Sequence, residues 1–277
     1  MPALSSIVGM SELFTSAVAH IHLPAIGFAI GSIIGLTGVG GGSLMTPILV
    51  GGFGVPPMIA VGTDLVFAAV TKSFGAVAHW RVGNVAKRLL AVLITASLTG
   101  AALAFAVIHE LRPNVVALNR VIRFALGVAL IGTASALLIR PWLMRIRRDR
   151  PPHEPSQGVS NQLWPTVVLG MSIGAVVTLS SVGAGAIGVT ALLLLHPTLP
   201  VARIVGTDIA YAVPLTAAAG LAHASVGHLD GDLLIGLLIG SVPGILVGAR
   251  LAKRVPELAT RSLLVATLSI AGVKLVA

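Results

Sequence analysis

Long apolar segments separated by short polar connections dominate the sequence. They lie near residues 23–52, 57–79, 87–109 and 118–140, and again near 163–195, 201–224, 232–252 and 260–277. A helix needs about 20 apolar residues to cross roughly 30 Å of hydrocarbon. Most of these segments are long enough for that, so the pattern predicts an all-α polytopic membrane protein.

Composition supports the same conclusion. Hydrophobic residues make up 56% of the 277 positions and charged residues only 10%, and the mean hydropathy is +1.00. Soluble domains carry roughly 25% charged residues. The net charge of +9 would suggest nucleic-acid binding in a soluble protein. Here the cations lie between apolar segments, so we expect membrane lipid and no nucleic acid as a partner.

One polar stretch divides the chain into a first transmembrane repeat at 23–140 and a second at 163–277. Five arginines fall between Arg140 and Arg150. The positive-inside rule therefore predicts that the linker, residues 141–162, is cytoplasmic in a multi-pass protein of the cell (plasma or inner) membrane. Residues 1–22 are mildly apolar, and both an interfacial segment and a weak extra span stay open.

The two halves repeat each other. The tetrapeptide Val61-Gly62-Thr63-Asp64 recurs as Val205-Gly206-Thr207-Asp208, and His79 recurs as His223 at the same offset. Upstream glycines also correspond, with one residue of slippage: Gly27, Gly31, Gly40 and Gly42 match Gly170, Gly174, Gly183 and Gly185. Ordered matches of this kind indicate an internal duplication.

Loop charges predict that the repeats have inverted topology. The loop after the first tetrapeptide helix carries Arg81, Lys87 and Arg88, whereas its counterpart carries Asp230 and Asp232. Matching loops of opposite charge fit opposite sides of the membrane. Inversion requires an odd number of crossings in each repeat. We therefore expect each repeat to be a Gly-broken re-entrant helical hairpin followed by three transmembrane helices.

Glycine-rich breaks interrupt the opening segment of each repeat, at 38–42 and 181–185. Irregular backbone at membrane depth is tolerated where it is buried or lines a cavity, and paired breaks of this kind mark transporter binding sites. A helix beginning near Ser43 or Ala186 would present free N–H groups to an anion. The candidate substrate-binding residues here are Gly40, Gly41, Gly42, Ser43, Gly183 and Gly185. The alternative is that the small residues serve only close helix packing.

Charged residues are scarce in the first 80 positions, where only Glu12, Asp64 and Lys72 occur. On a helix, Asp64, Lys72 and His79 lie within about 80° of one another. Lys72 could attract an anion, while Asp64 or His79 could take a proton. The alternatives are that Asp64 lies in the first turn of its helix, that His79 is interfacial and that Lys72 snorkels or pairs internally.

The second repeat carries a related stripe of Asp208, Thr216 and His223, so Lys72 has no charged counterpart. Asp208 and His223 are the matching candidates for proton coupling, with the same structural alternatives. Thr63 and Thr207 either cap helices or donate hydrogen bonds to the substrate.

At these residues the sequence resembles the sulfite exporter TauE/SafE family. The motifs are Gly38-Val39-Gly40-Gly41-Gly42, Pro47 and Ala60-Val61-Gly62-Thr63, with a second copy in Gly183-Ala184-Gly185 and Val205-Gly206-Thr207. The resemblance covers nearly the whole chain and implies export or uptake of small sulfur-containing anions such as sulfite, sulfonates or sulfoacetate. Two departures stand out: Asp64 and Asp208 replace a small hydroxyl residue, and Ser181 replaces a glycine.

Three functions follow as hypotheses. The first is a secondary transporter of a small sulfur-containing anion, coupled to protons or not, with the substrate between the two breaks. The second is a channel or transporter for another solute, such as a cation held by Asp64 and Asp208. The third, an intramembrane enzyme, is disfavoured because the histidines lack a tight HxxxH spacing. We expect no enzyme activity, no cofactor and no metal, and a homo-oligomer is left open.

Overall fold

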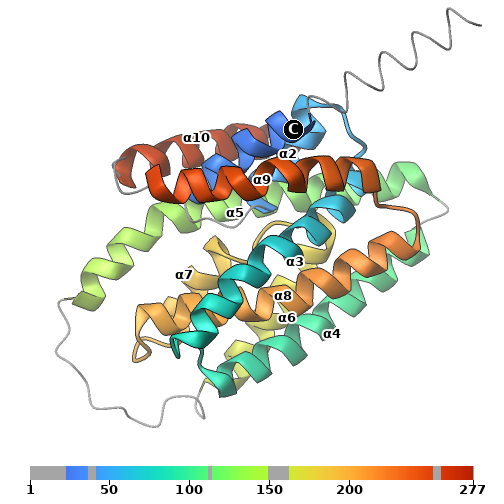
Figure 1. Ribbon diagram of the computed structural model, residues 1–277. Helices are drawn as coiled ribbons and strands as arrows, with labels where there is room; N and C mark the ends of the chain where they lie inside the picture. The colour runs from blue at the N-terminus through green and yellow to red at the C-terminus, as the bar shows by residue number, and fades with distance from the viewer. Residues whose placement is uncertain (1–22, 37–41, 112–113, 149–161, 252–256, 277) are drawn as a thin grey trace, which may run out of the picture. The chain divides into compact units, whose positions relative to one another are not determined.

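The computed structural model describes residues 23–36, 42–111, 114–148, 162–251 and 257–276, and every regular element in these ranges is a helix (Figure 1). The helices are Leu23–Leu36, α2 (Gly42–Gly52), α3 (Pro57–Arg81), α4 (Lys87–Leu111), α5 (Val115–Arg148), α6 (Leu163–Ser180), α7 (Ala186–Leu195), α8 (Val201–Ser225), α9 (Gly231–Leu251) and α10 (Glu257–Val276). The all-α prediction is confirmed for this part of the chain. The calls on residues 1–22 and on most of the linker lie outside it.

Six of the described helices are long and apolar enough to cross a membrane: α3, α4, α5, α6, α8 and α9. Two differences from the sequence pattern stand out. Helix α5 continues to Arg148, eight residues beyond the predicted end at 140, because the basic residues there are good helix formers. Helix α10 covers Glu257–Val276 and therefore begins three residues before the predicted segment at 260–277.

Helices α2 and α7 are short, with 11 and 10 residues. At 1.5 Å per residue they extend about 15–17 Å, or roughly half the hydrocarbon thickness. The chain breaks between α6 and α7, where Ser181, Gly183 and Gly185 have φ values of 58°, 122° and 133°. Helix α7 begins at Ala186, as the sequence predicts. The first break, residues 37–41, lies outside the described residues, and α2 follows it from Gly42.

The chain divides into two compact units, and the described part of the smaller one pairs Leu23–Leu36 with α9. Glycines make this pairing close. A Cβ atom on Gly27 would collide with the backbone of Leu237, and one on Gly31 with the backbone of Ser241. From the other side, glycines at every fourth position of α9 meet the first helix in the same way: Gly236, Gly240, Gly244 and Gly248. Small residues at this spacing let helix backbones approach within a membrane.

The larger unit contains a matching pair, α4 with α6. Gly174 meets the backbone of Ser97, and Gly100 meets the backbone of Met171. The corresponding contacts of the smaller unit are Gly31 with Ser241 and Gly244 with Phe28. In both pairs, the opening helix of one sequence repeat packs on the third long segment of the other repeat.

Helices α3 and α8 lie side by side within the larger unit and run antiparallel (Figure 1). Their contacts are reciprocal. A Cβ on Gly62, near the start of α3, would collide with the carbonyl of His228, which follows α8. A Cβ on Gly206, near the start of α8, would collide with the carbonyl of Asn84, which follows α3. Each tetrapeptide therefore packs against the far end of the other helix.

The larger unit has a buried apolar core and an apolar surface. Leu65, Phe67 and Tyr211 are fully buried, whereas Phe74 and Leu221 are each 69% exposed. Large apolar side chains in that exposed state would promote aggregation in water. In a lipid environment the exposed apolar side chains would contact acyl chains instead of water, which accounts for helices that are apolar on both their buried and their exposed faces.

Candidate functional site

Asp64 lies on α3, where it faces α2. The side chain has no exposed surface, and its Oδ2 accepts a hydrogen bond of 2.5 Å from the hydroxyl of Thr46 on α2. Its Oδ1 has no hydrogen-bond partner among the described residues. Ser181, at the start of the second break, lies beside the same carboxyl. Asp64 therefore lies between the short helix α2 and the break that precedes α7.

Asp208 lies on α8 and faces the other short helix, α7. Only 1% of its surface is exposed. A Cβ atom on Gly188 of α7 would collide with Oδ1 of Asp208 and would lie 2.9 Å from the hydroxyl of Tyr211. Oδ1 of Asp208 and the Tyr211 hydroxyl both lack hydrogen-bond partners among the described residues. The glycine at 188 is thus required for the carboxyl to reach α7.

Lys72 lies eight residues after Asp64 on α3, which is about 12 Å along the helix axis. It interacts electrostatically with Asp64 and with Asp208, and its ammonium donates a hydrogen bond of 3.0 Å to the carbonyl of Ala184 in the second break. Snorkelling or internal pairing is the structural alternative for Lys72, and this hydrogen bond shows internal pairing. Lys72 has no counterpart in the second repeat, but it interacts with the aspartates of both repeats.

Arg140 on α5 is a second cation of the site, and it interacts electrostatically with Asp208. We expected Arg140 to belong with the basic residues that precede the linker. Helix α5 instead passes α7, where Thr190 donates a hydrogen bond to the carbonyl of Ala136, one turn before Arg140. Within the sequence, Arg140 is simply the first of the five arginines at 140–150, so the sequence gives no sign of this role.

The carboxylates are buried and the cations are partly exposed. Asp64, Thr46, Asp208 and Tyr211 are all buried, whereas Lys72 and Arg140 are half-buried. Lys72 and Arg140 both interact electrostatically with Asp208, and Lys72 also interacts with Asp64. In a low-dielectric interior, charges are retained when they are paired or hydrogen-bonded. The two unpartnered carboxylate oxygens leave acceptor positions that a proton or a cation could fill, and Lys72 and Arg140 could bind an anion.

The alternative that the aspartates lie in the first turn of their helices is wrong. Helices α3 and α8 begin at Pro57 and Val201, and neither has an acidic residue in its first turn. Asp64 and Asp208 each lie seven residues after those starting points, because a proline precedes each helix and sets an earlier start. Stabilisation by the helix dipole, which is confined to the first turn, does not explain them.

The two threonines of the repeated motif are fully buried. The Thr207 hydroxyl donates to the carbonyl of Arg203 and accepts a 2.9 Å hydrogen bond from the amide of Ala86, which follows α3. Thr207 therefore joins α8 to the α3–α4 loop. Thr207 does not cap its own helix, whose N-cap residue is Pro200.

The two histidines lie in the last turns of their helices, about 22 Å along the axis from the aspartate of the same helix. Each instead approaches the tetrapeptide of the other repeat. His79 Nδ1 lies 3.0 Å from the position of a Cβ on Gly206, and Cβ of His223 lies 3.1 Å from that on Gly62. Asp208 is about 200° around the helix from Gly206, so His79 and the carboxyl occupy different faces.

His223 is buried rather than interfacial. Its Nε2 forms a hydrogen bond of 2.9 Å with the carbonyl of Thr178, and its ring packs against Phe105 and His228. Gly183 and Gly185 lie in the break itself. Gly42 and Ser43 begin α2, while Gly40 and Gly41 lie outside the described residues.

A broken helix, two half-length helices and a buried charged centre define a multi-pass membrane protein of the transporter class. The family model for "Sulfite exporter TauE/SafE" matches residues 23–275. The chain belongs to this family of membrane transporters, as its motifs predict.

Curated relatives carry transporter names. The chain is 36% identical over 256 residues to "Probable membrane transporter protein YjnA" of Bacillus subtilis (strain 168), which covers 92% of this chain and 99% of the relative. It is 25% identical over 253 residues to "Probable membrane transporter protein YdhB" of the same organism, covering 90% and 96% of the two chains. The search of solved structures gave no match.

Proposed function

We propose that this protein is a secondary transporter of a small sulfur-containing anion of the sulfite, sulfonate or sulfoacetate type. The substrate would bind between the start of α2 and the break at 181–185, with Lys72 as its main electrostatic contact. The observation that carries the proposal is the hydrogen bond from Lys72 to the carbonyl of Ala184 in the break, made by an ammonium that also interacts electrostatically with two buried carboxylates. Broken helices at membrane depth occur where backbone lines a transport site.

The anion would compete with protein groups for Lys72. In this structure the ammonium of Lys72 donates a hydrogen bond to the Ala184 carbonyl. A substrate oxyanion would replace that carbonyl as the acceptor. The amides at the start of α7, from Ala186 onward, would add donors and the positive end of the helix dipole. Gly183 and Gly185 would allow the backbone to approach the substrate, since neither carries a side chain.

Proton coupling would reduce the electrostatic repulsion between the substrate anion and the two carboxylates. A proton on Asp64 or Asp208 would remove a negative charge as the anion binds. The free oxygens of both side chains make room for such a proton. Any part of His79 and His223 in coupling would pass through the α3–α8 interface. Each histidine lies about 22 Å along the axis from the aspartate on its own helix.

Inverted repeats would provide alternating access by rocking of one repeat against the other. The antiparallel packing of α3 and α8, with its reciprocal contacts of Gly62 and Gly206, supports this part of the proposal. The basic end of α5 supports a cytoplasmic linker and placement in the cell membrane, by the positive-inside rule.

A second function, cation transport, is favoured by one observation. Asp64 and Asp208 each present an unpartnered carboxylate oxygen in a buried setting, and oxygen ligands of this kind suit hard cations. Replacing each aspartate by asparagine separates the two functions. Cation transport would collapse, whereas anion binding would survive or tighten because a negative charge is lost.

Uptake into proteoliposomes tests the proposal directly. Protein reconstituted in vesicles would be supplied with sulfite, thiosulfate, an alkanesulfonate and sulfoacetate, each with and without a proton gradient. We expect saturable uptake of at least one anion, inhibited by the others that bind. Lys72→Met is the matched inactive variant. Absence of uptake for the whole panel, with sodium or potassium flux present instead, would overturn the anion proposal.

A further inference from the structure

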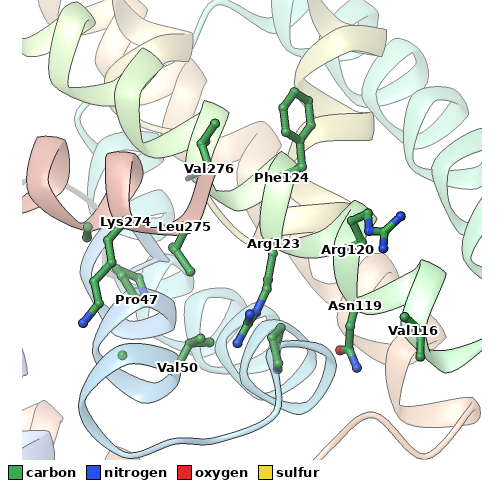
Figure 2. A pocket seen from close by; sticks show the side chains of 13 residues that line it. Pro47, Val50, Val116, Asn119, Arg120, Arg123, Phe124, Lys274, Leu275 and Val276 are labelled. Atoms are coloured by element: carbon green, nitrogen blue, oxygen red, sulfur yellow. The ribbon is translucent and has the colours of Figure 1, made fainter.

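A second charged feature lies within the larger unit, at the ends of four helices (Figure 2). A pocket of about 1030 Å³ opens between the end of α2, the start of α3, the first turns of α5 and the end of α10. Arg120, Arg123 and Lys274 line it, and no carboxylate lies among its thirteen lining residues. The three cations are exposed.

Membrane topology alone does not explain these cations. Arg120 and Arg145 are 25 residues apart on the continuous helix α5, which corresponds to about 38 Å along the axis. That distance exceeds the roughly 30 Å of hydrocarbon, so an α5 that crosses the membrane would place the two arginines on opposite sides. The positive-inside rule can place only one of these basic groups, and Arg145 belongs with the basic linker.

The remaining lining is apolar. Val50, Phe124 and Leu275 line the pocket together with its cations, and Figure 2 places the Arg123 side chain pointing toward Val50. Phe124 is 58% exposed. A pocket of this volume, with cations and apolar walls, is far larger than a small inorganic anion needs and suits an anionic amphiphile.

The side-chain oxygen of Asn119 in this pocket requires a hydrogen-bond donor from the ligand. Oδ1 of Asn119 is buried and has no hydrogen-bond partner among the described residues, and Asn119 lines the same pocket. A headgroup that carries hydroxyls as well as a phosphate would satisfy both Asn119 and the cations. Basic pockets between membrane helices bind anionic lipid headgroups in this way.

We propose that this pocket binds the phosphate headgroup of an anionic phospholipid with a hydroxyl-bearing headgroup, the lipid's acyl chains lying along Phe124 and Leu275. The site is separate from the charged centre of Asp64, Lys72 and Asp208, and the proposal does not depend on which solute is transported. A bound lipid would connect the start of α5 to the end of α10, so it would stabilise the larger unit.

Native mass spectrometry of the full chain tests the proposal. Protein in a neutral detergent would be mixed with phosphatidylglycerol or with zwitterionic phosphatidylcholine, and retained lipid would be counted at rising salt. We expect preferential, salt-sensitive retention of phosphatidylglycerol by the wild type. Arg120→Gln, Arg123→Gln and Lys274→Gln should each weaken retention about fivefold, as expected for about 1 kcal/mol per cation at a membrane surface.

The matched control replaces three exposed cations outside the pocket, in Arg81→Gln, Lys87→Gln and Arg88→Gln. This variant should retain the lipid as the wild type does. The variant that combines Arg120→Gln, Arg123→Gln and Lys274→Gln is its counterpart, and equal retention by this variant and the wild type would overturn the proposal. Equal retention of the two lipids by the wild type would also overturn it, and that result needs no variant to fold. Inorganic phosphate forms the last arm. If phosphate raises the thermal stability of the wild type but not of the variant that lacks all three pocket cations, and phosphatidylglycerol raises neither, the pocket takes a free anion and the lipid proposal fails.

Discussion

The ammonium of Lys72 on α3 donates a hydrogen bond of 3.0 Å to the carbonyl of Ala184, 112 residues further along the chain. The bond connects a helix of the first sequence repeat to the break in the second. Because Asp64 and Asp208 also interact with Lys72, this one side chain links both copies of the repeated motif. The predictions below follow from that arrangement and from the close packing around it.

Removing the charge of Lys72 should impair transport more than folding. We expect Lys72→Met to lower the initial rate of anion uptake about ten- to a hundredfold, since a charge-assisted hydrogen bond contributes roughly 1.5–3 kcal/mol. Lys72→Arg should retain part of the rate because the charge remains. Proteoliposome uptake at matched protein content measures both. Arg81→Gln, an exposed cation in the last turn of the same helix, is the control, and a wild-type rate for Lys72→Met would contradict this prediction.

Neutralising either aspartate should separate coupling from binding. In Asp64→Asn and Asp208→Asn we expect stimulation by a proton gradient to disappear, because the side chain can no longer take up and release a proton. Exchange of labelled for unlabelled anion across the vesicle membrane, which needs no net proton movement, should continue. Measuring gradient-driven uptake and exchange on the same vesicles checks this. Normal gradient-driven uptake in both variants would exclude these residues from coupling.

Gly188→Ala should destabilise the protein by its contact with Asp208. The added Cβ would collide with Oδ1 of Asp208 and crowd the Tyr211 hydroxyl, and overpacking of a filled interior costs about 1–3 kcal/mol. Thermal unfolding in detergent should show a lower melting temperature. Gly52→Ala is the matched control on the other half-length helix, since its nearest neighbour, Cγ2 of Ile48, lies 3.9 Å away. An unchanged melting temperature for Gly188→Ala would mean that Asp208 does not press against α7.

The two motif glycines should be equally intolerant of a side chain. We expect Gly62→Ala and Gly206→Ala to lower the free energy of unfolding by similar amounts, about 1–3 kcal/mol each, since each new Cβ would meet a backbone carbonyl. Unfolding curves of both variants provide the comparison. Gly51→Ala, with no atom within 4 Å of the added carbon, should be neutral or stabilising. A large effect at one motif glycine and none at the other would argue against the reciprocal packing.

Much of the fold follows from local patterns in the sequence. The apolar segments predict the long helices, since only regular hydrogen bonding satisfies a backbone in lipid. The glycines at 183 and 185 predict the break before α7, because their positive φ values are unfavourable for other residues. Repetition of the tetrapeptide identified Asp64 and Asp208 as related positions.

Other features depended on contacts between distant segments. Arg140 reads as part of a basic stretch, and only the passage of α5 beside α7 brings it near Asp208. Because α3 and α8 begin at Pro57 and Val201, Asp64 and Asp208 lie beyond the first turn of their helices. The pocket of Arg120, Arg123 and Lys274 joins segments about 150 residues apart, so no local pattern could indicate it.

The sequence by itself determined that this chain forms long apolar helices, that the tetrapeptide Val-Gly-Thr-Asp occurs twice and that glycines break the helix before α7. These properties depend on side-chain hydrophobicity and backbone freedom, which act within a few residues. The tertiary structure decided which charges meet. Lys72 on α3 interacts with Asp208 on α8 because these two helices pack side by side, and that packing depends on long-range contacts between helices.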